Sequence, residues 1–71
     1  MFRLYIVNNC DSCDRVIAYP ETNGIDCKIV TYEDEKPVMP IFIFPALFYN
    51  DRLIAYGDDI ITYFNNIKAN G

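Results

Sequence analysis

Two apolar segments separated by a short helical pattern restrict the fold more than any other feature of this sequence. Residues 2–7 (FRLYIV) are aromatic, β-branched and almost continuously apolar, which is typical of a strand covered on both faces. Acids and a hydroxyl then occupy residues 11–14, where a helix begins, and Val16, Ile17 and Tyr19 supply its apolar face, with Cys13 as a further candidate for it. Residues 26–33 (DCKIVTYE) predict a second strand. A strand, a helix and a strand with short joints predict a right-handed parallel βαβ unit.

Helix-breaking residues divide the middle of the chain. Pro20 either ends or kinks the first helix, and Gly24 is its natural C-terminal residue. Pro37 and Pro40 exclude a long helix after the second strand. Residues 41–49 (IFIFPALFY) return to strand character, so a loop is expected between the βαβ unit and the next strand.

The last part of the chain predicts a hairpin and a closing helix. Residues 50–51 (ND) suit a two-residue turn that leads into a strand at residues 52–56 (RLIAY). Gly57 and Asp58 open a helix whose apolar face is formed by residues at helical spacing: Ile60, Ile61, Phe64 and Ile67. The order is β-α-β-loop-β-β-α, which predicts an α/β fold with a mixed four-stranded sheet and helices packed on it.

Length and composition limit the classes of protein that this chain can be. With 71 residues, 52% of them hydrophobic, residues 1–71 predict a single folded domain with a small core. We expect Phe42, Phe44 and Phe48 to lie in that core, with lining a substrate groove as the alternative for one of them. A net charge of −4 without a basic stripe argues against a nucleic-acid partner.

Two further features concern the location of the protein. Prolines interrupt the longest apolar run, residues 38–49, which is also too short to span a membrane, and residues 1–9 do not resemble a signal peptide. The three cysteines are an odd number, whereas small disulfide-stapled secreted domains carry four or more in even number. We therefore expect a cytoplasmic protein.

The pair Cys10 and Cys13 admits three interpretations. A zinc site needs four ligands, but the chain has no histidine and only one further cysteine, Cys27, so a metal site would need a carboxylate or a second chain. A role as small buried apolar residues suits Cys27 within a strand, but not two cysteines at a strand-to-helix junction where the chain is expected to be exposed. A redox pair is the favoured interpretation.

The redox interpretation has a physical basis in the start of the helix. Unpaired backbone N–H groups and the helix dipole favour a thiolate at Cys10, which can then attack an external disulfide. Cys13 lies about one turn further along and can resolve the mixed disulfide. The carboxylates of Asp11 and Asp14 oppose this effect, so we expect the pKa of the Cys10 thiol to lie only moderately below its ordinary value.

With CDSC after the first strand and FPALFYNDRLIAYGDDI at residues 44–60, the chain resembles the thioredoxin superfamily, and the glutaredoxins most closely. The resemblance implies an abbreviated glutaredoxin-like fold, because residues 33–44 leave little room for the second helix of the family. It implies a cis-proline at Pro45, preceded by Phe44 with backbone groups for an extended substrate. It places Asn50 and Arg52 in the hairpin turn. Gly57 and Asp58 would bind substrate, although Asp58 could instead cap the final helix.

The implied function is that of a thiol–disulfide oxidoreductase, an electron carrier that reduces protein disulfides or glutathione mixed disulfides. Cys10 would be the nucleophile and Cys13 the resolving thiol. No bound cofactor or metal is expected, and glutathione or a thioredoxin reductase would be the reductant. We expect a monomer whose partner is a disulfide-containing protein, with no nucleic-acid or membrane partner. The alternatives are a non-catalytic thioredoxin-like binding module and a metal-binding CxxC protein.

Overall fold

The computed structural model describes the backbone of residues 1–70 and the side chains of residues 1–68. Strand β1 (Phe2–Ile6) leads into helix α1 (Asp11–Asn23) and strand β2 (Cys27–Thr31). Strands β3 (Ala46–Tyr49) and β4 (Arg52–Tyr56) and helix α2 (Asp59–Asn70) follow. The four strands form one sheet in the order β2-β1-β3-β4, in which β1 is parallel to β2 and antiparallel to β3. The predicted α/β fold with a mixed four-stranded sheet is confirmed.

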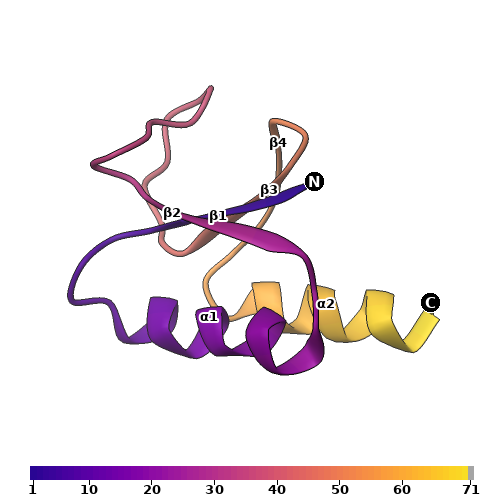
Figure 1. Cartoon of the computed structure of the whole chain (residues 1–71). Coiled ribbons are helices and arrows are strands. Elements are labelled where there is room, and N and C mark those ends of the chain that lie inside the picture. The colour runs from indigo at the N-terminus through magenta and orange to yellow at the C-terminus, as the bar shows by residue number, and fades with distance from the viewer. Residues whose placement is uncertain (71) are drawn as a thin grey trace.

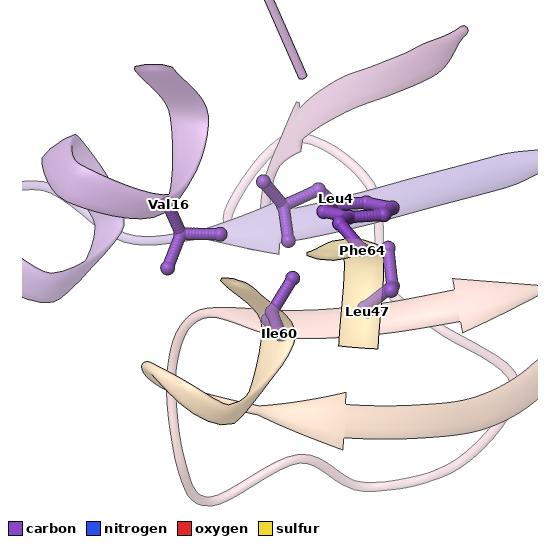
Figure 2. Packing of buried hydrophobic residues seen from close by; sticks show 5 residues of the cluster. All are labelled: Leu4, Val16, Leu47, Ile60 and Phe64. Atoms are coloured by element: carbon purple, nitrogen blue, oxygen red, sulfur yellow. The ribbon is translucent and has the colours of Figure 1, made fainter. Parts of the chain in front are cut away.

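Both helices cover one face of the sheet, and the segment between β2 and β3 lies on the other side (Figure 1). Side chains alternate along β1, so that Leu4 points toward the helices. Figure 2 shows Leu4 and Leu47 from the sheet meeting Val16 from α1 and Ile60 and Phe64 from α2, all fully buried. This cluster fixes both helices against the sheet. Over the described residues, neither helix is long and apolar enough to cross a membrane.

The opposite face of the sheet carries a second, smaller apolar cluster. Tyr5, Ile41, Ala46 and Phe48 are buried there, with Phe44 packed against them at its edge. The segment that covers this face, residues 32–45, contains turns but no helix, as its two prolines lead one to expect. The fold is therefore the abbreviated one that the sequence predicts.

The same segment corrects two sequence predictions. The strand expected over residues 41–49 is shorter, because only Ala46–Tyr49 pair with β1 and the preceding residues follow an irregular path. Phe42 is not in the core as expected: its side chain is 88% exposed. Residues outside the sheet do not alternate between its two faces, so Phe42 has no buried position to occupy.

Helix α1 continues through Pro20 rather than ending there. Pro20 is buried in the last turn, and the helix runs on to Asn23. Gly24 then adopts the left-handed conformation, with φ of 65°, and its N–H donates to the Pro20 carbonyl. The prediction that Gly24 terminates this helix is confirmed, since glycine enters this conformation without the steric penalty of a side chain.

The β3–β4 hairpin turns at Asn50 and Asp51, as predicted. Their φ angles are 49° and 68°, so both central residues lie in the left-handed region that a type I′ turn requires. A register shift between Leu47 and Phe48 marks a bulge in the same hairpin. The chain leaves β4 through Gly57 and Asp58, and α2 begins one residue later than expected, at Asp59.

Candidate redox site

The strand register brings the predicted site residues to one edge of the sheet. Tyr5, near the end of β1, pairs with Ala46 at the start of β3, and Ala46 pairs with Tyr56 at the end of β4. Consequently the end of β1, the start of β3 and the end of β4 lie at the same edge of the sheet. Cys10 follows β1 at this edge. We call this edge, with the starts of α1 and α2 and the turn after β2, the disulfide edge.

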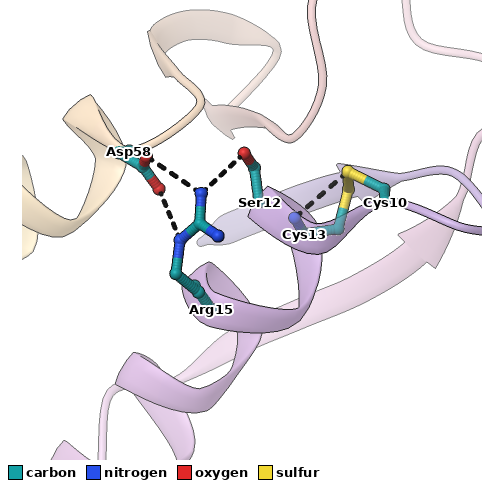
Figure 3. The surroundings of a disulfide bond; sticks show 5 residues. All are labelled: Cys10, Ser12, Cys13, Arg15 and Asp58. Carbon is teal, nitrogen blue, oxygen red and sulfur yellow. Dashed lines mark hydrogen bonds and ion pairs between the residues drawn. A yellow bond between two sulfur atoms is a disulfide. The ribbon is translucent and has the colours of Figure 1, made fainter.

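Cys10 and Cys13 are joined by a disulfide bond, with their Cα atoms 5.2 Å apart (Figure 3). Cys10 is the N-cap of α1, and its φ and ψ of −124° and 106° are those of extended backbone. Its Sγ accepts the backbone N–H of Cys13 at 3.1 Å, in the way that a serine or aspartate oxygen caps a helix. The prediction that this pair lies at a helix N-terminus within bonding reach is confirmed.

The two sulfurs differ in their access to solvent. Cys13 is only 1% exposed, whereas Cys10 is partly exposed. The sequence left two placements open for Cys13, an exposed junction and the buried face of the helix. The structure has the buried one, because the first turn of α1 points this residue toward the sheet. A solution disulfide can reach Cys10 more easily than Cys13, and Cys13 is placed to react with Cys10.

A thiolate at Cys10 would find both favourable and unfavourable groups. The Cys13 N–H that now contacts the Cys10 Sγ is a donor that stabilises negative charge, and it belongs to the positive end of α1. Asp11 and Asp14 are exposed carboxylates in the same first turn and act in the opposite direction. The moderate pKa shift expected of the reduced Cys10 thiol stays a prediction.

An ion pair that sequence reasoning missed connects the two helix starts. Arg15 of α1 donates from Nε and Nη2 to the Asp58 carboxylate at 3.3 and 3.2 Å, and Nη2 also donates to the Ser12 hydroxyl at 3.0 Å (Figure 3). The hydrogen bond with Asp58, and then its charge, raise the pKa of the Arg15 guanidinium. The spacing of Ser12 and Arg15 on one helix could have indicated their contact. Asp58 is 43 residues from Arg15, and no local pattern indicates that pair.

The cis-proline expected from the resemblance is present, since the Phe44–Pro45 peptide bond is cis. Pro45 is buried, and its carbonyl accepts the N–H of Gly57 at 2.7 Å, which fixes the start of β3 against the end of β4. Phe44 is half-buried against the edge of Tyr32, with ring centroids 5.1 Å apart. Phe44, Pro45, Gly57 and Asp58 thus come to the disulfide edge, while their predicted role in substrate binding stays a prediction.

Cys27 lies at the other end of the sheet. It opens β2 opposite Phe2, the first residue of β1, whereas Cys10 follows the last residues of β1. Burial, and secondarily the charge of Asp26, raise the pKa of the Cys27 thiol to about 11, so it is a poor nucleophile at neutral pH. Over the residues that the structure describes, no group of three or more His, Cys, Asp or Glu side chains could hold a metal ion.

A surface depression of about 260 Å³ also lies away from the cysteines. Its lining residues lie along β1 and the β3–β4 hairpin: Met1, Arg3, Tyr5, Phe48, Asn50 and Asp51. Neither Cys10 nor Cys13 lines it, and neither does any of the predicted substrate-binding residues.

Comparison with known proteins identifies the architecture. Glutaredoxin 1 from Francisella tularensis, whose crystal structure was solved in complex with cacodylate, superposes with a TM-score of 0.68. The match covers 99% of this chain and 96% of that protein. The chain has a glutaredoxin-like fold. The sequence identity is 20%, and no protein-family model and no curated protein matches the sequence.

The glutaredoxin-like fold confirms the resemblance noted in the sequence, including its order of strands and helices. At this level of identity the comparison establishes the fold alone. The function has to be argued from the cysteine pair and its surroundings.

Proposed function

We propose that this protein is a thiol–disulfide oxidoreductase that reduces protein disulfides or glutathione mixed disulfides. The observation that carries the proposal is the geometry of Cys10. Its sulfur is partly exposed, accepts the first-turn N–H of Cys13 at 3.1 Å, and is already bonded to the buried sulfur of Cys13. Thiol–disulfide exchange needs one accessible sulfur stabilised as a thiolate and a second sulfur within reach.

In the reduced protein the Cys10 thiolate attacks one sulfur of the substrate disulfide. The substrate S–S bond breaks, its other sulfur leaves as a thiolate and takes up a proton, and Cys10 becomes part of a mixed disulfide. The Cys13 thiol gives up its proton and attacks the Cys10 sulfur, which forms the Cys10–Cys13 disulfide and releases the second substrate thiol. Two electrons pass from the dithiol to the substrate.

The oxidised pair must then be reduced again. Two molecules of glutathione can reduce it: the first forms a mixed disulfide with Cys10, and the second attacks that mixed disulfide and releases oxidised glutathione. A thioredoxin reductase could supply the same two electrons. No bound cofactor or metal enters this cycle. The proposal includes a monomer in the cytoplasm, where thiol reductants keep such a dithiol in use.

Four residues of the disulfide edge are proposed to hold the substrate. Phe44 precedes the buried Pro45 and would offer backbone groups to an extended segment, since proline itself has no N–H to donate. Gly57, with φ of 54° and open space around its Cα, leaves room for a ligand beside the start of α2. The Asp58 carboxylate would contact a substrate cation, in competition with Arg15.

Insulin reduction tests the proposal. The wild-type protein, supplied with a thiol reductant, should accelerate insulin precipitation, and Cys10→Ser should abolish the acceleration. Cys13→Ser should attack once and accumulate a mixed disulfide through Cys10, detectable by mass. Cys27→Ala is the matched control and should retain activity because Cys27 lies at the far end of the sheet. Equal activity of the wild-type protein and Cys10→Ser would refute the oxidoreductase function and favour a non-catalytic binding module. Zinc or iron retained through purification would favour a metal-binding protein.

A further inference from the structure

The charged side chains of this protein are distributed unevenly between the two ends of the sheet. The carboxylates of the disulfide edge come from three places, namely the first turn of α1, the turn after β2 and the start of α2: Asp11, Asp14, Glu33, Asp34, Glu35, Asp58 and Asp59. The charge of Glu35 is offset by Arg3, with which it forms an ion pair. The same edge has two basic side chains, Arg15 and Lys36. It therefore holds an excess of negative charge at the end of the sheet where the cysteine pair lies, and Asp11 and Asp14 belong to the same helical turn as that pair.

The rest of the molecule is balanced. Apart from the Arg3–Glu35 ion pair, its acidic side chains are Glu21, Asp26 and Asp51, and its basic side chains are Lys28, Arg52 and Lys68. The net side-chain charge of −4 thus resides on the disulfide edge.

The two basic side chains of that edge are both engaged. Arg15 forms an ion pair with Asp58 and donates to the Ser12 hydroxyl, so the charges of Arg15 and Asp58 offset each other. The Lys36 ammonium lies over the Tyr32 ring, 4.0 Å from its centroid. Asp11 and Asp14, in contrast, follow Cys10 in the first turn of α1 and are exposed to an incoming molecule.

The segment between β2 and β3 also presents apolar side chains to solvent. It leaves and rejoins the sheet at the disulfide edge, and its exposed apolar residues are Val38, Met39, Phe42 and Ile43. Their exposures lie between 41% and 88%. A polypeptide can contact such a surface over several residues, whereas a small polar disulfide cannot.

We propose that the substrate of the cysteine pair is a disulfide carried by a positively charged polypeptide segment, and that anionic disulfides of the glutathione type react poorly. This inference rests on the proposed function. Carboxylates beside the attacking sulfur raise the local concentration of cations and lower that of anions. In water, the interaction of two unit charges about 7 Å apart is close to RT. Before screening by salt, one such pair therefore changes the reaction rate by a factor of roughly three. With two exposed carboxylates facing two substrate charges, the ratio between a cationic and an anionic substrate should reach about tenfold at low salt.

Matched peptide disulfides provide the test. The probes are the symmetrical disulfides of Ac-Lys-Cys-Lys-amide, Ac-Gln-Cys-Gln-amide and Ac-Glu-Cys-Glu-amide, which differ in charge around one identical bond. The pre-reduced wild-type protein is mixed with each probe in excess at about 20 mM salt, and the rate of disulfide transfer is measured. Each rate is divided by the rate of the same probe with 2-mercaptoethanol, which removes the intrinsic reactivity of the peptide.

The expected result is a corrected rate order of lysine over glutamine over glutamate peptide, with about a tenfold ratio between the extremes. That ratio should fall toward one in 1 M salt, where the Debye length is about 3 Å. Asp11→Asn combined with Asp14→Asn should reduce the ratio several-fold. Glu21→Gln combined with Asp26→Asn removes the same charge from the balanced part of the molecule and should leave the ratio unchanged. A ratio of rates is used because it does not depend on how each variant alters the Cys10 thiolate itself.

The outcomes separate this inference from the proposed function. If the wild-type protein reduces all three peptides at equal corrected rates, the charge preference is refuted and the oxidoreductase function stands. If the Glu21→Gln, Asp26→Asn variant changes the ratio as much as the Asp11→Asn, Asp14→Asn variant, the disulfide edge is not its source and the inference is overturned. If no peptide is reduced by wild type at a rate above that of Cys10→Ser, the proposed function fails, and the substrate preference with it.

Discussion

Replacement of Phe64 by alanine should destabilise this protein far more than the chemically identical replacement of Phe42. Phe64 is fully buried in α2, where its ring meets Phe2 edge-on at a centroid distance of 5.3 Å and stacks on Tyr19 at 6.1 Å. Phe42 is 88% exposed on the segment between β2 and β3. The two variants remove the same atoms, so their difference reports burial alone.

The magnitude follows from the size of the domain. A Phe-to-Ala change at a fully buried site costs about 3–5 kcal/mol, through lost burial and the cavity left behind. A domain of 71 residues has a total stability of roughly 4–11 kcal/mol at about 0.05–0.15 kcal/mol per residue. Phe64→Ala should therefore remove about a quarter or more of the free energy of unfolding. Phe42→Ala should change it by less than about 0.5 kcal/mol.

Urea unfolding followed by far-UV circular dichroism measures both effects on the disulfide-bonded protein. Because Phe64→Ala could leave too little folded protein for a complete curve, Phe64→Leu is measured as well and should lose about 1–1.5 kcal/mol. Such a loss lowers Tm by several degrees in a domain of this size. If Phe64→Ala were tolerated as well as Phe42→Ala, α2 would not pack on the sheet as described, and the arrangement of the disulfide edge would have to be abandoned.

Three further predictions concern the cysteines and the ion pair. In urea unfolding under reducing conditions, Cys10→Ala should be about 1 kcal/mol less stable than Cys10→Ser. Serine keeps an acceptor for the Cys13 N–H, whereas alanine does not. Equal stabilities of the two variants would show that this cap contributes nothing. In the reduced protein at pH 7.5, Cys27 should react with iodoacetamide about a hundredfold more slowly than a thiol of pKa 9.0, because its pKa is raised to about 11. The same shift stabilises the folded protein below pH 9 and is lost as the pH rises from 9 to 11, so a Cys27→Ala variant should show a flatter decline of stability in that window, and a parallel decline would contradict the shift. Arg15→Met and Asp58→Asn should each lower Tm only slightly, because both side chains are mostly exposed. The double variant should lose no more than either single variant, and the loss should disappear in 1 M salt. Additive losses in the double variant would mean that the two residues act separately.

Much of the fold could be predicted from local patterns. The apolar run before Cys10, the acids that follow it and the glycine at position 24 indicate a strand, a helix start and a helix end, and the structure has each of them. The turn at Asn50 and Asp51 is equally local, because residues that tolerate positive φ are few. These features depend on the preferences of neighbouring residues, which a sequence displays directly.

Features that depend on contacts between distant segments could not be predicted in this way. The exposure of Phe42 reflects how far β3 extends, which is settled by pairing with β1 rather than by the apolar character of residues 41–45. The burial of Cys13, which the sequence left open, depends on which face of α1 meets the sheet. In both cases the residue pattern indicates an apolar face, but the packing partner decides which residues that face includes.

The sequence by itself determined that two thiols stand one helical turn apart at a strand-to-helix junction, because spacing and capping act within a few residues. Only the tertiary structure decided what surrounds them. Arg15 meets Asp58 across 43 positions of the chain, and the carboxylates of three separate segments gather at one edge while the other end stays neutral. Electrostatic interactions depend on distance in space, and the sheet order sets those distances.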